Sequence, residues 1–388
     1  MTKILVSTDI GSDIDDALAL LVMFNLGMEI EAVYTTNGDV VSRALIAKHM
    51  AEIANSKARI CLGEAESYDK SVKPYNLYSE LLVDESHIDW KATESSPEII
   101  YKPLKRIGIV ENGVEDMAKL LSEEKFIIFS LAPLTSIARV ISSYPGVIHN
   151  IKHLYIMGCR FFGETKMEHN MHFDPQAARI VFDSEIPITV VPGDVCSRYR
   201  MPVTIFDRCK SEVGMYVKKM AEAFIAASTA KEFWSFLNSE YKIKKIIDLD
   251  GISSHLMAKV NQGEKERSLR RVFSAEGVLL DIEGAVFDSE YYMRVYNTLI
   301  EYLVNSESSG IKKVISGHLL SLIPESISVA DVYIPYCFKY REKIKIIRGT
   351  VNLSESLGES YLSAGEKHLI VSDIDAAHFG MFLKENIY

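Results

Sequence analysis

The sequence is poor in cysteine and carries no excess of basic residues. Its 388 residues include five cysteines, and none of them forms a C-x-x-C pair, which argues against a zinc ribbon or a thioredoxin-like redox site. Lys and Arg total 43 against 53 Asp and Glu, so the net charge is -10. Nucleic acids and anionic membranes bind basic surfaces, and we therefore expect neither as a partner.

Long apolar runs are also missing. No stretch approaches the roughly 18 residues that a membrane span needs, and the sequence begins directly with a strand pattern in place of a signal peptide. Together with the odd number of cysteines, this predicts a cytoplasmic protein. Apolar residues make up 48% and charged residues 25% of the chain, which is typical of a soluble globular protein with a sizeable core.

Strand and helix patterns alternate along much of the chain. This alternation predicts an α/β protein with a mainly parallel, Rossmann-like sheet flanked by helices. The expected strands are residues 4–8, 30–36, 126–131, 151–157, 188–191, 329–338, 344–353 and 367–372, and the expected helices are 17–24, 42–55, 134–141, 175–183 and 375–385. Residues 1–202 and 326–388 would form the core, and residues 203–325 a largely helical insertion or cap.

Four carboxylates follow the first expected strand within eight residues: Asp9, Asp13, Asp15 and Asp16. Helix capping explains one or two of them. Four crowded carboxylates repel one another unless a cation neutralises them, and hard cations such as Ca²⁺ or Mg²⁺ prefer oxygen ligands. The sequence therefore favours a divalent metal site over capping alone. The spacing differs from that of an EF-hand.

Four segments in order carry a resemblance to one enzyme family. They are residues 9–17 (DIGSDIDDA), 130–138 (SLAPLTSIA), 157–158 with 168–178 (MG and EHNMHFDPQAA), and 367–375 (KHLIVSDID). Together they resemble the signatures of the inosine–uridine-preferring nucleoside hydrolases. The resemblance implies that family's fold, tightly bound Ca²⁺ and hydrolysis of the N-glycosidic bond of a ribonucleoside.

The resemblance also implies a metal site and a catalytic base. The metal ligands would be the carboxylates of Asp9 and Asp16, the main-chain carbonyl of Leu131, and Asp331. Asp248 and Asp250 compete with Asp331 for the last position. Asp15 would take the proton from the attacking water, and Asp13 is the alternative because two extra residues in the loop shift its register.

Substrate contacts follow from the same resemblance. Glu168 and Asn170 would bind ribose, although polarity of a surface loop is the alternative reading, and Asp39 would contact the sugar or belong to a turn. His87 is a weaker match to a substrate loop. Activation of the leaving base stays unassigned, because Ala330 stands where several purine-acting members of the family have His. Tyr333, Tyr336 and His255 are possible substitutes.

The leading prediction is a Ca²⁺-dependent N-ribosyl hydrolase of purine or pyrimidine salvage, acting on a small-molecule ribonucleoside as a homodimer or homotetramer. Two alternatives remain. The first is a nucleoside-binding protein that has lost catalysis, and the second is a metal-dependent phosphohydrolase. The acidic region after the first strand disfavours a phosphate ester.

Overall fold

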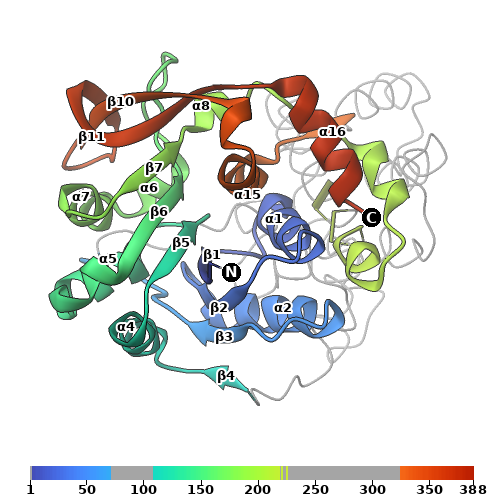
Figure 1. The fold of residues 1–388 in the computed structure, drawn as a ribbon, viewed down its shortest axis with the longest axis horizontal. Coiled ribbons are helices and arrows are strands. Elements are labelled where there is room, and N and C mark those ends of the chain that lie inside the picture. Colours follow the sequence, from blue (N-terminus) through green and yellow to red (C-terminus); the bar gives the residue numbers. More distant parts are fainter. Residues whose placement is uncertain (1, 71–107, 219, 222–223, 226–323) are drawn as a thin grey trace, which may run out of the picture.

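The computed structural model describes residues 2–70, 108–218, 220–221, 224–225 and 324–388. Within them, a nine-stranded sheet runs through the middle of the molecule with helices on both faces (Figure 1). The strand order is β10-β11-β7-β6-β5-β1-β2-β3-β4. The predicted α/β class with a mainly parallel sheet is confirmed.

The first strand, β1 (Ile4–Thr8), lies near the centre of the sheet. It pairs in parallel with β2 (Ile30–Thr35) and β5 (Phe126–Ser130). All five of its residues are buried, as expected for a parallel strand covered on both faces. Outward from this centre lie β3 (Arg59–Leu62) and β4 (Ile109–Val110) on one side, and β6 (Ile151–Met157) and β7 (Ile188–Val191) on the other.

Alternate side chains of β1 enter two separate cores. Ile4 and Val6 pack with α1 (Ile14–Asn25), α2 (Val40–Ile53) and α16 (Ala376–Asn386). Leu5 points the other way and packs with the second group of helices. That group is α4 (Gly113–Glu123), α5 (Thr135–Ser143) and α7 (Pro175–Asp183). Figure 1 shows the two groups on opposite faces of the sheet.

A long hairpin ends the sheet on one side. Strand β11 (Ser360–Ile374) runs parallel to β7, and β10 (Ile344–Leu353) pairs antiparallel with β11. The predicted strand over 344–353 matches β10, and the strand predicted over 367–372 lies within the longer β11. The antiparallel edge explains why the sheet is mainly, and not wholly, parallel.

The strand predicted over residues 329–338 is wrong. The structure has a short strand, β9 (Ser326–Ile327), then a 3-10 helix, η7 (Ala330–Val332), and the helix α15 (Tyr333–Lys339). Residues 333–337 are all buried, and a short segment that is apolar on every side has no periodicity to separate a buried helix from a buried strand. Strands β3 and β4 and helix α4 were not predicted.

Most of the expected insertion, residues 203–325, lies outside the residues that the structure describes. Its first part begins with the 3-10 helix η4 (Val203–Arg208). His87, Asp248, Asp250 and His255 also lie outside the described residues. Among the helices that can be described, none is both long and apolar enough to cross a membrane.

Candidate metal and active site

The candidate site begins where β1 ends. After Thr8 the chain turns through Gly11, whose φ of +107° is a backbone conformation that favours glycine. A Cβ at Gly11 would also lie 3.1 Å from Cδ1 of Ile46. Asp13 then caps α1 with extended backbone and makes no side-chain capping bond. This turn directs the first residues of α1 toward the carboxyl edge of the sheet, where ligands of α/β folds bind.

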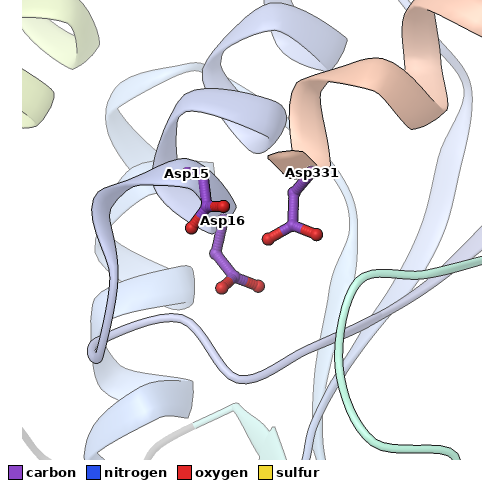
Figure 2. Close-up of side chains that lie close together, drawn as sticks. All are labelled: Asp15, Asp16 and Asp331. Carbon is purple, nitrogen blue, oxygen red and sulfur yellow. The ribbon is translucent and has the colours of Figure 1, made fainter. Parts of the chain in front are cut away.

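Three carboxylates meet at this edge. Asp15 and Asp16 come from the first turn of α1, and Asp331 comes from η7 near the far end of the sequence. Figure 2 shows the carboxylate of Asp331 facing the two from α1, and one oxygen of each lies within 4.8 Å of the others. Asp16 and Asp331 are buried and Asp15 is half-buried. We call these residues the acidic triad.

The environment of the acidic triad disfavours three negative charges. Burial, followed by the charge of Asp13, raises the pKa of Asp15 to about 8. Burial and the neighbouring carboxylates also raise the pKa of Asp16 and of Asp331 well above the usual range. The three carboxylates therefore repel one another when they are ionised, and a bound cation would reduce this repulsion.

The donor atoms fit a hard divalent cation. All three side chains offer carboxylate oxygen, the ligand type that Ca²⁺ and Mg²⁺ prefer. Oδ1 of Asp331 is buried and accepts no hydrogen bond from the described residues. A buried acceptor without a partner is costly, and an ion bound there would satisfy it.

Asp9 and Asp13 lie on either side of the turn and differ in exposure. Asp9 is 7% exposed, and its Oδ2 accepts a hydrogen bond of 3.1 Å from Nδ2 of Asn37. It is not one of the triad, but its charge raises the pKa of Asp16. Asp13 is exposed. The structure thus brings Asp15, and not Asp13, to Asp331.

Leu131 and Asn170 join two neighbouring strand ends. Leu131 follows β5, and its carbonyl accepts a hydrogen bond of 2.9 Å from Nδ2 of Asn170. The same nitrogen donates to the carbonyl of Met157 at the end of β6, at 3.2 Å. Both amide hydrogens of Asn170 are therefore used within the protein, and its Oδ1 is the atom left to meet a ligand.

Glu168 and Asn170 are not surface residues. They are 7% and 5% exposed, so the alternative reading as loop polarity is wrong. Glu168 caps α6 (His169–Phe173), because its carboxylate accepts from the main-chain nitrogens of Asn170 and Met171. The nitrogen of Cys159 donates to the same carboxylate at 3.3 Å. Burial raises the pKa of Glu168.

Other candidates are not members of the triad. Asp39 is half-buried before α2, and the described triad does not include its carboxylate. Tyr333 and Tyr336 are fully buried. Their rings lie 4.2 Å and 4.9 Å from that of Phe379 on α16, and the hydroxyl of Tyr336 is 3.1 Å from Nδ1 of His378. Both tyrosines pack α15 against α16, which argues against them as acids for the leaving base.

The sequence prediction missed three residues beside the site. Thr8 donates from its hydroxyl to the carboxylate of Asp16. Asn37 holds Asp9, and Arg43 is 2% exposed although it is charged. The sequence carried a signal for Arg43, because the residue lies on the apolar side of its helix. Ala44 follows it directly, Val40 precedes it by three residues and Ala47 follows it by four.

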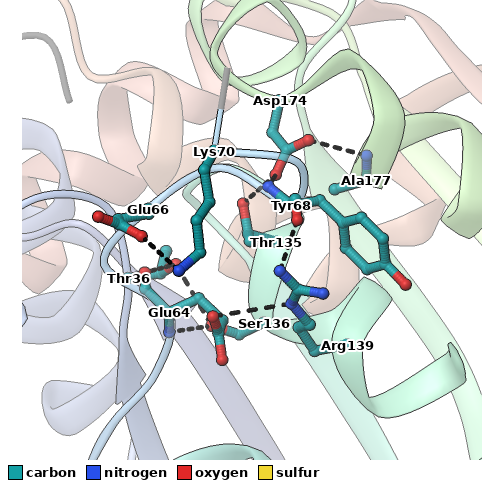
Figure 3. Close-up of polar contacts among 10 residues, drawn as sticks. All are labelled: Thr36, Glu64, Glu66, Tyr68, Lys70, Thr135, Ser136, Arg139, Asp174 and Ala177. Carbon is teal, nitrogen blue, oxygen red and sulfur yellow. Dashed lines mark hydrogen bonds and ion pairs between the residues drawn. The ribbon is translucent and has the colours of Figure 1, made fainter. Parts of the chain in front are cut away.

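A second polar network fixes the loop after β3 (Figure 3). Asp174 caps α7 by accepting from the nitrogen of Ala177. Its Oδ2 accepts from the Thr135 hydroxyl and the Tyr68 nitrogen, each at 2.6 Å. The carbonyl of Glu64, in the same loop, accepts from the nitrogen of Asn37 at 2.8 Å. The loops after β2 and β3 are therefore tied together at the carboxyl edge.

Fold and site together define an α/β protein with an oxygen-rich candidate cation site at the carboxyl edge of its sheet. Residues 4–255 match the family model described as inosine-uridine preferring nucleoside hydrolase. The chain belongs to this family, and the resemblance seen in the sequence is confirmed. Asp331 lies beyond the matched residues, and the fold brings it to the site.

Among curated proteins, the pyrimidine-specific ribonucleoside hydrolase RihA of Escherichia coli O1:K1 / APEC is similar to this chain. It is 32% identical over 135 residues, which cover 33% of this chain and 43% of that protein. The same protein from Escherichia coli O9:H4 (strain HS) gives the same identity and coverage. The chain therefore matches less than half the length of these curated relatives.

Solved structures share the fold. A plant nucleoside hydrolase, the PpNRh1 enzyme, has a TM-score of 0.65 at 14% identity, and the match covers 100% of this chain and 98% of that one. A purine-preferring ribonucleoside hydrolase from Gardnerella vaginalis has a TM-score of 0.57 at 14% identity, with coverage of 100% and 98%. At such identities the likeness establishes the fold alone.

Proposed function

We propose that the protein hydrolyses the N-glycosidic bond of a ribonucleoside with the help of a divalent cation, most suitably Ca²⁺. The observation that carries this proposal is the acidic triad, where Asp331 meets Asp15 and Asp16 and has a buried oxygen without a partner among the described residues. Family membership supplies the reaction class. The oxygen-only triad supports a hard cation over a transition metal.

Four groups would hold the cation: the carboxylates of Asp9, Asp16 and Asp331, and the carbonyl of Leu131. A bound divalent cation supplies Lewis acidity toward water and the ribose hydroxyls. Thr8 orients Asp16 through the hydrogen bond of its hydroxyl, and Asn37 orients Asp9. The Leu131 carbonyl keeps one lone pair beyond the one that Asn170 occupies.

Asp15 would act as the general base. It is half-buried, whereas Asp16 and Asp331 are buried, so it is the member of the triad that water reaches most readily. In the protein without a cation its pKa is raised to about 8 by burial and by Asp13. A cation bound beside it would favour the ionised carboxylate, which is the form that accepts a proton. Cleavage of the ribosyl bond develops positive charge on the sugar, and the surrounding carboxylates stabilise that charge.

Ribose would be bound by Glu168 and Asn170, with Asp39 as a further contact. The hydrogen bonds within the protein limit how they bind. Asn170 offers Oδ1 as an acceptor, because both of its amide hydrogens are used. Glu168 accepts from three main-chain nitrogens and has one further site on Oε1. Both side chains would therefore accept hydrogen bonds from sugar hydroxyls.

Both purine and pyrimidine nucleosides are candidate substrates, because the names of the relatives refer to different bases. One is called pyrimidine-specific and another purine-preferring. The family resemblance also favours a role in base salvage, assembly as a homodimer or homotetramer, and a cytoplasmic setting.

The test is base release from a panel of purine, pyrimidine and modified ribonucleosides. Wild type is compared with Asp15→Asn and Asp331→Asn, in Ca²⁺ and after chelation. Asp116→Asn is the matched control, because this carboxylate pairs with Arg59 outside the triad, at 2.8 Å. We expect release by wild type and the control alone, and only with the cation.

Other results would select the alternatives. Nucleoside binding without base release from any member of the panel would indicate a binding protein. Release of phosphate from a phosphate ester, without release of base, would indicate a phosphohydrolase. Equal base release by wild type and Asp331→Asn would refute the assigned role of the triad.

A further inference from the structure

Arg43 is a charged residue in an apolar position. It lies in α2, one turn after Asp39, and is 2% exposed. Burial of a guanidinium is costly unless its donors are satisfied. Four hydrogen bonds of Arg43 help to meet this cost, and they connect it to the loops of the candidate site.

The guanidinium joins two loops. Nη1 donates to the carbonyls of Asp9 and Ile10, the latter at 2.9 Å, and Nη2 donates to the Ser12 hydroxyl at 2.7 Å. Nε donates to the carbonyl of Asn37 at 2.7 Å. One planar side chain thus fixes the turn after β1 and Asn37 in the loop after β2. The planar fork of arginine suits such a set of bonds better than the ammonium of lysine.

Asn37 carries the connection to the site. Its φ of +67° is a left-handed conformation that Asn and Gly tolerate best. Arg43 holds its carbonyl, and the Glu64 carbonyl accepts from its nitrogen at 2.8 Å. In this fixed position, Nδ2 of Asn37 donates to Oδ2 of Asp9 at 3.1 Å. The amide therefore orients a carboxylate that the proposed function assigns to the cation.

We propose that Arg43 and Asn37 are positioning residues that set the affinity of the site for a divalent cation. Arg43 holds the main chain that carries Asp9, and Asn37 holds the carboxylate of Asp9. Groups that orient ligands in this way typically change metal affinity by about 10-fold to 100-fold when they are removed. The inference rests on the proposed function, because it takes Asp9 to be a ligand.

The rival explanation is that Arg43 and Asn37 serve the stability of the fold alone. The two explanations differ in what they predict for the folded protein. A purely stabilising pair would change the unfolding midpoint without changing the dissociation constant for the cation. A positioning pair would raise the dissociation constant of protein that is still folded.

The experiment is calorimetric titration of chelator-treated, full-length protein with CaCl₂, with circular dichroism to verify folding. The variants are Asn37→Gly, Arg43→Lys and Arg43→Met. Asn37→Gly removes the amide and tolerates the left-handed backbone. Arg59→Met is the control, because Arg59 begins β3 and pairs with Asp116 at 2.8 Å, away from the triad.

We expect Asn37→Gly to raise the dissociation constant for Ca²⁺ by about 10-fold and Arg43→Met by at least as much. Arg43→Lys should fall between wild type and Arg43→Met, because lysine keeps the charge and loses the fork. Arg59→Met should bind as wild type does. Folded Asn37→Gly or Arg43→Lys with a wild-type dissociation constant would overturn the inference. Wild type without any affinity for divalent cations would refute the proposed metal site itself.

Discussion

Asp331→Asn should change stability in opposite directions with and without the cation. Asp331 is 4% exposed, and its Oδ1 is buried with no partner in the part of the chain that the structure describes. Asp15 and Asp16 repel its charge. Asparagine removes that charge at nearly the same volume. In chelator, we therefore expect the variant to unfold at a higher urea concentration than wild type.

The size of the effect follows from two terms. An unsatisfied buried acceptor costs about 1–3 kcal/mol. Without cation, the amide nitrogen of the variant can take the place of that acceptor and donate to a neighbouring carboxylate, which relieves the cost. A ligand at 100 times its dissociation constant stabilises the folded state by about 2.7 kcal/mol. Wild type gains this second term in Ca²⁺, and the variant loses most of it. Because the two terms are of similar size, the advantage of the variant should disappear at that Ca²⁺ concentration. At 1,000 times the dissociation constant the ligand term grows to about 4.1 kcal/mol, and wild type should become the more stable protein.

The assay is urea unfolding at neutral pH, in chelator and in saturating Ca²⁺, with Asp116→Asn as the control. Asp116 bonds to Arg59 and to the Tyr34 hydroxyl, so its substitution should destabilise the protein equally in both conditions. If Asp331→Asn destabilises the protein in chelator, repulsion between the triad carboxylates does not destabilise the cation-free protein. If Ca²⁺ stabilises the variant as much as wild type, Asp331 is not a ligand.

Three further predictions concern single residues. Asp15→Asn should lower turnover by about 100-fold or more, measured by steady-state kinetics, while its nucleoside affinity, measured by calorimetry, stays within a few-fold of wild type. A comparable loss of affinity would contradict the role of Asp15 as the base. Gly11→Ala should destabilise the protein by about 1–3 kcal/mol in urea unfolding, because φ is +107° at this position. An unchanged urea midpoint would show that the turn adapts to alanine and would contradict the prediction. Burial lowers the pKa of His368, whose Nδ1 accepts from the Val351 nitrogen. Neutral His368 therefore stabilises the folded protein fully when the pH is above the pKa of histidine in the unfolded chain, about 6.5. This stabilisation is lost as the pH falls below that value. Between pH 7.5 and 5, the free energy of unfolding should fall less for His368→Gln than for wild type. An equal fall in both proteins would refute the role of His368.

The order of elements was readable from the sequence wherever strands were long and apolar. The strand predicted over residues 151–157 and that over 344–353 match β6 and β10 to the residue. Strand β4 was missed because it has two residues and gives no periodic signal. Helix α4 was missed although it is 11 residues long. The segment 329–338 was assigned to the wrong element because it is buried on every side. Its tertiary surroundings, and not its own pattern, decide that it is helical.

The candidate site was partly readable for a different reason. Crowding of Asp9, Asp13, Asp15 and Asp16 is a local feature, and it predicted a cation site before any fold was known. Which of these carboxylates points inward depends on the turn at Gly11, which spacing does not specify. Asp331 depends on a contact between the two ends of the chain, and the choice between it and Asp248 or Asp250 rested on resemblance alone. Hydrogen bonds between loops, such as those of Arg43, leave only an indirect trace in the sequence.

The position of Asp331 links metal binding to folding. Asp15 and Asp16 belong to α1, which follows the central strand β1, whereas Asp331 belongs to η7, directly before α15. A cation held by both segments would join the N-terminal half of the sheet to the helix that packs against α16. Without it, the same carboxylates repel each other across that junction. The site that supports catalysis in our proposal is therefore also the place where the cation would contribute most to the stability of the fold.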